Sequence, residues 1–142
     1  MFCEIKPLNS YATYKYVVIL SEFDGKLLLS RHRRRETWET QGGHIEPGET
    51  PIDAARRELY EESGATEYDI TPLFDYRTIN ERGDSAGVIF FATIRALSSI
   101  PDSEMAEVRL FDGLPENVTY PDITPCLYAE ARRMGLFTNL SH

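Results

Sequence analysis

The segment from Thr50 to Gly64 constrains the fold most, because it specifies both ends of one amphipathic helix. Thr50 is a good N-cap, Pro51 suits the first helical position, and Gly64 can take the left-handed conformation that ends a helix. Apolar residues at i, i+3 and i+7 form one stripe along the helix: Ile52, Ala55 and Leu59. The pattern therefore predicts a helix over 51–63 that packs one face on a sheet.

Segments rich in Tyr, Val, Ile and Leu on both sides of this helix predict strands. The predicted strands cover residues 14–22, 26–30, 38–43, part of 70–79, 86–96 and 108–111, and a second helix is predicted over 123–134. Strands and helices in this order favour an α/β domain with a mixed sheet. The 142 residues are enough for one domain and too few for two ordinary ones, so we expect a single domain over 1–142.

The composition excludes several classes of protein. Because 15 Lys+Arg stand against 23 Asp+Glu, the formal net charge is -8, which argues against a general affinity for nucleic acid or anionic membrane. No apolar run approaches the roughly 20 residues of a membrane span, and residues 1–7 lack the pattern of a secretory signal. Cys3 and Cys126 stand far apart without metal-type spacing, which is typical of reduced thiols. We therefore expect a cytoplasmic protein with no membrane partner.

Three carboxylates crowd one side of the predicted helix. Glu58, Glu61 and Glu62 are spaced i, i+3 and i+4, so their side chains project from the same side. At about 6 Å and an effective dielectric of about 20, each pair repels by about 3 kcal/mol, and the negative end of the helix dipole adds to this. One explanation is a solvated acidic face paired with Arg56 and Arg57. The other is Mg²⁺ or Mn²⁺, held by hard oxygen ligands together with substrate phosphates.

The residues around this cluster resemble the Nudix hydrolase family. The family signature is glycine, any five residues, glutamate, any seven residues, then arginine, glutamate, an aliphatic residue, any residue, two glutamates, any residue, glycine and an aliphatic residue. Every defined position before the last is matched at the correct spacing: Gly43, Glu49, Arg57, Glu58, Leu59, Glu61, Glu62 and Gly64. Ala65 is the one departure, since a larger aliphatic residue is usual there, and it concerns packing rather than the ligands.

The resemblance implies a Nudix-type α/β/α sandwich with a mixed central sheet. It also implies hydrolysis of a nucleoside diphosphate derivative, with Mg²⁺ or Mn²⁺ as cofactor. Glu61 and Glu62 would be the main metal ligands, Glu58 a further ligand or the base that activates water, and Gly43 part of the metal site. Glu58 and Glu61 are accordingly the catalytic residues expected on the helix.

Further roles follow from the same resemblance. Glu49 and Arg57 would form a structural pair that holds the preceding loop on the helix. In many relatives a carboxylate from a loop outside the signature joins the metals or acts as the base. We choose Glu104 for this catalytic role, because Glu107 abuts a predicted strand and could simply pair with an arginine; Asp102 is a weaker third candidate.

Substrate-binding candidates precede the signature. Residues 31–35 form a basic run with two interpretations: it binds phosphates or the 5′ end of an RNA, or it is an exposed loop. Arg31 is the first candidate for substrate binding because it directly follows a predicted strand. Trp38 either stacks on a base or belongs to the core. Trp38 and Glu39 before the Gly-Gly turn are typical of the Nudix branch that acts on oxidised nucleoside triphosphates, although Gln41 replaces the usual proline.

These features favour a pyrophosphohydrolase of modified nucleoside triphosphates such as 8-oxo-dGTP. Removal of pyrophosphate from RNA 5′ ends is the alternative if the basic run takes part, and hydrolysis of ADP-ribose or another nucleotide sugar comes third. A nucleotide-binding module without turnover is a further alternative, against which the intact set of glutamates argues. The expected state is a monomer or a homodimer.

Overall fold

The computed structural model describes residues 2–101 and 104–141, in which two helices and seven strands are found. All the strands belong to one sheet of order β1-β5-β6-β2-β3-β7, with β4 paired on β2. The β2–β6 pair is parallel and the other pairs are antiparallel, so the sheet is mixed. The elements are β1 (Phe2–Lys6), β2 (Tyr16–Phe23), β3 (Lys26–His32), β4 (Gln41–His44), α1 (Pro51–Ser63), β5 (Ala65–Asn80), β6 (Gly83–Leu97), β7 (Met105–Phe111) and α2 (Thr124–Arg133).

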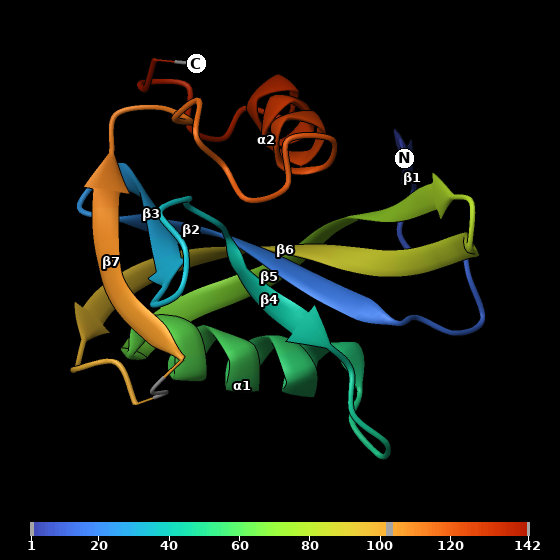
Figure 1. Cartoon of the computed structure of the whole chain (residues 1–142), viewed down its shortest axis with the longest axis horizontal. Coiled ribbons are helices and arrows are strands. Elements are labelled where there is room, and N and C mark those ends of the chain that lie inside the picture. Colours follow the sequence, from blue (N-terminus) through green and yellow to red (C-terminus); the bar gives the residue numbers. More distant parts are fainter. Residues whose placement is uncertain (1, 102–103, 142) are drawn as a thin grey trace.

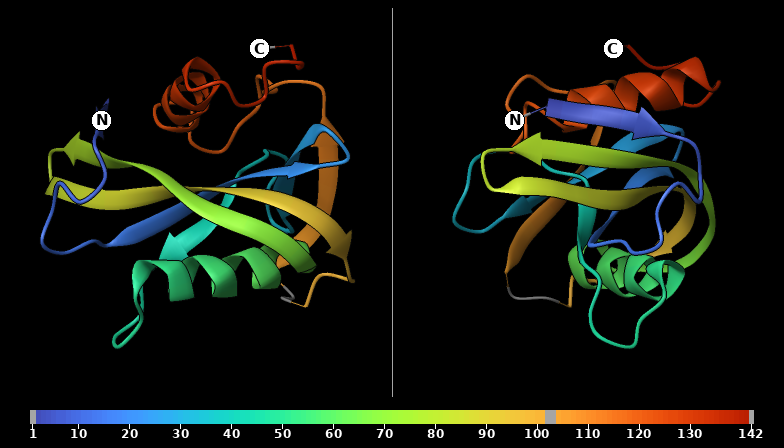
Figure 2. Two further views of the ribbon diagram at one scale, coloured as in Figure 1. Left: turned by 180° about the vertical axis from the view of Figure 1, so that it is seen from behind. Right: turned by 90° about the vertical axis from the view of Figure 1, so that its right-hand side faces the viewer.

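The sheet lies between the two helices, with α1 on one face and α2 on the other (Figure 1 and Figure 2). Successive side chains of a strand point to opposite faces. In β2, Val17 and Ile19 therefore join the apolar cluster of α1, whereas Leu20 joins the cluster that includes Leu127 of α2. Both faces of this central strand are buried. The expected α/β/α sandwich with a mixed central sheet is confirmed.

Helix α1 has the predicted bounds and caps. The Thr50 hydroxyl accepts a hydrogen bond from the Asp53 N–H at 3.3 Å, and the Asp53 carboxylate accepts one from the Thr50 N–H at 3.3 Å. Gly64 ends the helix at φ 80°, where its N–H donates to the Tyr60 carbonyl at 2.8 Å. A Cβ on Gly64 would lie 2.3 Å from the Ser98 carbonyl oxygen, so the close approach of the segment that follows β6 to this helix end also requires glycine.

Strand β1 was not predicted from the sequence. It is an edge strand, and its residues pair with β5 from Phe2 opposite Ile79 to Lys6 opposite Asp75. A short edge strand has weak hydrophobic alternation, and its pairing partner lies far along the chain. Local sequence patterns therefore do not reveal it.

Other boundaries differ from the predicted ones. The strands predicted within 70–79 and over 86–96 are parts of the longer hairpin β5–β6, which contains register shifts that relax the alternation of side chains. The strand predicted over 38–43 is shorter, because Trp38 and Glu39 form only isolated bridges before β4 begins. Within the described residues, neither helix has the length and apolar content required to cross a bilayer.

Candidate active site

The carboxylates expected to bind metal lie on the side of α1 that approaches β4. The Glu62 carboxylate accepts a hydrogen bond from the backbone N–H of Gly42 at 2.7 Å. The Glu58 carboxylate lies against Gly43, since a Cβ added there would be 2.8 Å from Glu58 Oε1. Only a residue without a side chain permits this contact. The two glycines of β4, which we call the Gly-Gly strand, thus allow two of the three glutamates to lie close to the sheet.

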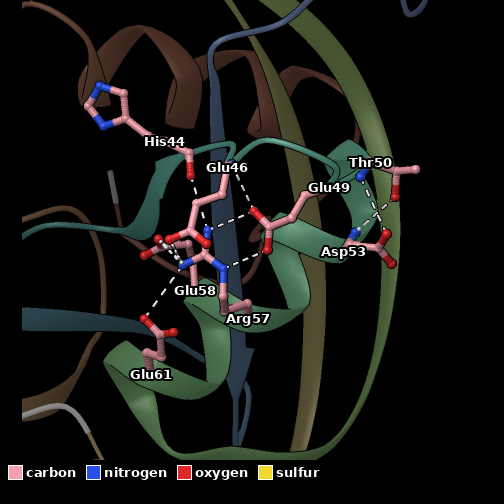
Figure 3. Close-up of polar contacts among 8 residues, drawn as sticks. All are labelled: His44, Glu46, Glu49, Thr50, Asp53, Arg57, Glu58 and Glu61. Atoms are coloured by element: carbon pink, nitrogen blue, oxygen red, sulfur yellow. Dashed lines mark hydrogen bonds and ion pairs between the residues drawn. The ribbon is translucent and has the colours of Figure 1, made fainter.

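Arg57 lies at the centre of the charged network (Figure 3). Its Nε and Nη2 donate to the two oxygens of Glu49 at 2.7 and 2.9 Å, and Nη2 also donates to the His44 carbonyl at 3.1 Å. Its Nη1 donates to Glu58 Oε1 at 2.7 Å and lies 3.6 Å from Glu61 Oε2. One guanidinium therefore fastens the loop before α1 to the helix and neutralises part of the acidic cluster.

These contacts shift the pKa values of two glutamates in opposite directions. Hydrogen bonds from Arg57, and then from the backbone N–H of Glu46, lower the pKa of Glu49 to about 2. Burial raises the pKa of Glu58 above its ordinary value, and the hydrogen bond from Arg57 opposes that rise. Glu49 therefore remains an ionised structural anion, whereas Glu58 takes up a proton more readily than an exposed glutamate does.

The donor chemistry fits a hard divalent cation, because the side chains of the cluster offer carboxylate oxygens. Within residues 2–101 and 104–141, no three acidic, histidine or cysteine side chains are grouped as they would be around an ion. The cause is local, since Glu58 and Glu61 turn toward the Arg57 guanidinium and Glu62 turns toward the Gly42 N–H. Holding an ion between these carboxylates requires Glu61 or Glu62 to change partners.

The carboxylates suggested outside the helix have different environments. Glu107 accepts a hydrogen bond from Arg31 Nε at 3.0 Å, so it does pair with an arginine. Glu104 is exposed in the turn before β7, where its backbone carbonyl accepts a hydrogen bond from the Arg33 N–H at 2.9 Å. Asp102 lies outside the described residues. Glu104 is thus the more accessible of the two described candidates.

The three substrate-binding candidates contact protein groups of the same region. Arg31 binds Glu107 and also donates to the Arg35 carbonyl at 2.9 Å. Trp38 is 5% exposed, and the Arg109 guanidinium lies 4.7 Å from the centre of its ring. Glu39 is 7% exposed and accepts a hydrogen bond from Arg35 at 3.2 Å. Trp38 therefore packs in the core, as one of the two sequence interpretations had it.

A buried polar chain under the site was missed by the sequence reasoning. The Gln41 carbonyl oxygen accepts from the Ser21 hydroxyl at 2.7 Å, and its amide donates to the Ser30 hydroxyl at 2.9 Å. Ser30 in turn donates to the Glu62 backbone carbonyl at 2.9 Å. This chain connects β2, β4 and β3 to the end of α1. Its only signal in the sequence was the amide of Gln41 next to the two glycines.

Comparisons with known proteins agree with this geometry. A family model described as the NUDIX domain matches residues 13–117. A Bacillus subtilis protein named as the 8-oxo-dGTP diphosphatase YtkD is 36% identical over 106 residues, which are 74% of this chain and 66% of that protein. An RNA pyrophosphohydrolase of Tolumonas auensis is 36% identical over 56 residues, which are 39% of this chain and 32% of that protein. The matched part spans less than two thirds of either relative.

Solved structures show the same arrangement of strands and helices over nearly the whole chain. The crystal structure of the Bacillus subtilis pyrophosphohydrolase BsRppH is 26% identical and has a TM-score of 0.79, with 94% of this chain and 91% of that chain covered. The family match, the fold and the glutamate helix against the Gly-Gly strand all lead to one conclusion. The chain belongs to the Nudix family of hydrolases.

Proposed function

We propose that this chain is a cytoplasmic, Mg²⁺- or Mn²⁺-dependent pyrophosphohydrolase that cleaves a phosphoanhydride bond of modified nucleoside triphosphates such as 8-oxo-dGTP. The observation that carries the proposal is the acidic side of α1 against the Gly-Gly strand, where Glu58 contacts Gly43 and Glu62 contacts Gly42. The relative named as an 8-oxo-dGTP diphosphatase supports this choice of substrate.

In this proposal Glu58, Glu61 and Glu62 hold the divalent metal at the C-terminal half of α1. When bound, the metal polarises a phosphoryl oxygen, lowers the pKa of bound water and neutralises charge on the phosphates. Arg57 pairs with Glu58 and Glu61 and anchors the loop before α1 through Glu49. Glu58 would serve either as one of these ligands or as the base that accepts a proton from water.

Hydrolysis of RNA 5′-triphosphate ends is the second candidate. Residues 31–35 carry four arginines, and the loop that they form binds the backbone of Glu104, the carboxylate proposed as a further catalytic group. The similarity to an RNA pyrophosphohydrolase and to BsRppH also supports this candidate. Nucleotide sugars such as ADP-ribose remain the third class to test.

A substrate panel tests the proposal. The purified protein is incubated with Mg²⁺ or Mn²⁺ and with dNTPs, 8-oxo-dGTP, ADP-ribose or 5′-triphosphate RNA, and the released phosphates are identified. We expect Glu61→Gln to lower turnover by about 100-fold, as loss of a metal ligand does, while circular dichroism stays native. Glu81→Gln removes the same charge from the exposed β5–β6 turn and serves as the control. Wild-type turnover in Glu61→Gln would contradict the ligand assignment.

A further inference from the structure

The two cysteines of the chain lie next to each other in the structure, although 123 positions separate them in the sequence. The Cys126 thiol donates a hydrogen bond to the Cys3 backbone carbonyl, with 3.9 Å between the sulfur and the oxygen. The Cys126 side chain is also hydrogen-bonded to the Cys3 thiol. Sequence spacing does not reveal this contact, because it depends wholly on the fold.

Two different elements carry the cysteines. Cys3 lies on β1, the short strand at the edge of the sheet, and Cys126 lies in the first turn of α2. Cys3 and Ile5 pack against the apolar cluster on the α2 face of the sheet, as alternate residues of one strand do. The right-hand view of Figure 2 shows β1 directly below α2. The two thiols therefore meet where the edge strand contacts the helix.

Both cysteines are free thiols, and both are partly exposed, so a small reagent in solution reaches them. Burial raises the pKa of the Cys3 thiol above its ordinary value, and the neighbouring Cys126 thiol raises it further. A raised pKa keeps the proton on the sulfur near neutral pH, and the thiol form is not the nucleophile. The cysteines therefore persist as a pair of thiols until an oxidant reacts with them.

We propose that Cys3 and Cys126 form a reversible intramolecular disulfide, made by exchange with a low-molecular-weight disulfide such as oxidised glutathione, that fastens β1 to α2. One thiolate attacks a sulfur of the external disulfide, which forms a mixed disulfide and releases one thiol. The second thiolate attacks the protein sulfur of the mixed disulfide and releases the second thiol. The protein loses two electrons and two protons, which leave as the two small thiols. In a reducing compartment the same exchange runs backward and restores the two thiols.

The contact between the thiols favours closure of this bond over addition of a second small molecule. A disulfide needs an S–S distance of about 2.05 Å, so sulfurs already in hydrogen-bond contact must approach by about 2 Å. A neighbouring thiol held in place also reacts as though it were present at a very high concentration. The second step should therefore outrun attack by free glutathione disulfide on the remaining thiol.

The bond would act on stability rather than on hydrolysis. It encloses residues 3–126, nearly the whole chain, and a cross-link around a long loop restricts the unfolded state strongly. We expect the disulfide form to melt about 10 °C higher than the dithiol form. The cysteines lie on the α2 face of the sheet, whereas the acidic helix α1 covers the other face (Figure 1). The inference is therefore independent of the proposed function.

The test is made on the folded wild-type protein, incubated with oxidised glutathione without denaturant and then treated with an alkylating reagent to block remaining thiols. We expect the intact mass to fall by two hydrogen atoms, with neither glutathione nor alkylating reagent attached. The protein should run as a monomer on non-reducing gels, and digestion should release one linked fragment that contains both cysteines. Dithiothreitol should reverse the change in mass and the rise in Tm.

The matched controls are Cys3→Ser and Cys126→Ser, each of which keeps one thiol and nearly the same side-chain shape. Each should take up one glutathionyl group and show no rise in Tm of the size seen in the wild type. Circular dichroism checks that both variants are folded. If either fails to fold, the mass and the linked fragment of the wild type still decide the question.

Several results would overturn the inference. Two glutathionyl groups on the wild type would show that the thiols are too far apart to join, and disulfide-linked dimers would show that the partner is another copy. Thiols that stay free in the folded protein, or that join only in urea, would show that the native contact does not lead to a bond. A linked protein with the Tm of the dithiol form would show that the bond does not fasten β1 to α2.

Discussion

The contact between Gly43 and Glu58 gives a direct test of how the site is assembled. In Gly43→Ala the new Cβ would lie 2.8 Å from Glu58 Oε1, whereas ordinary van der Waals contact begins at 3.4 Å. The carboxylate must therefore retreat by about 0.6 Å, since overlap of that size is not tolerated in packed protein. Because it is the far end of a flexible side chain, the cost in stability should be only about 1 kcal/mol.

The cost in activity should be larger. Moving Glu58 disturbs the 2.7 Å hydrogen bond from Arg57, and with it the convergence of Glu58 and Glu61. Misplacement of a reacting group by about 1 Å can cost about 100-fold in rate. We therefore expect Gly43→Ala to lower kcat/KM by about 10- to 100-fold.

Gly48→Ala is the matched control for this substitution. Gly48 belongs to the same loop and has φ 85°, and no atom lies within 4 Å of an added Cβ. Alanine there should cost about 1–2 kcal/mol of backbone strain, or about 4 °C in Tm, with the rate retained. The assays are steady-state hydrolysis and thermal unfolding followed by circular dichroism. A Gly43→Ala enzyme with the wild-type rate would refute the argument that activity requires direct contact of Glu58 with the Gly43 backbone.

Three further predictions concern stability. Gly64→Ala combines left-handed strain with a clash against the Ser98 carbonyl and should cost about 3 kcal/mol in urea unfolding, more than Gly48→Ala does; an equal cost would exclude the clash. The pKa of Glu49 is about 2 in the folded protein, below the ordinary value of about 4.3. Ionised Glu49 therefore stabilises the fold at pH values above about 4.3, and this stabilisation is lost as the pH falls toward 2. Glu49→Gln should therefore show a flatter decline of urea midpoints from pH 5 to 2 than the wild type, and parallel curves would contradict this. Gln41→Leu removes the acceptor of the buried Ser21 hydroxyl and the amide that donates to Ser30, and should lower the free energy of unfolding by about 2 kcal/mol; a neutral effect in thermal melts would show that the polar chain is dispensable.

The helix at the centre of the site was predictable because the information for it is local. The cap at Thr50, the stop at Gly64 and the spacing of the three glutamates all act within a few turns of one helix. The same holds for the continuous apolar run at the start of β2, which predicted a strand there. The sequence also reached the correct family, since the signature is a contiguous pattern on this helix and the loop before it.

The features that the sequence did not reveal depend on partners far along the chain. Strand β1 exists because β5 pairs with it, and the contacts of Trp38 with Arg109 and with the segment around Val118 decide between its two sequence interpretations in favour of the core. The contact of Glu58 with Gly43 likewise depends on the approach of β4 to the helix.

The sequence by itself determined the capped helix, the three carboxylates on it and the resemblance to the Nudix hydrolases. Tertiary structure alone decides which arginines are neutralised and which face solvent. The pairing of Arg31 with Glu107 follows from the register of β3 on β7, in which the two residues are partners, whereas Arg33 and Arg34 are exposed in the turn after β3. The physical reason is that charge compensation acts over a few ångströms in space, and residues that close can be distant in sequence.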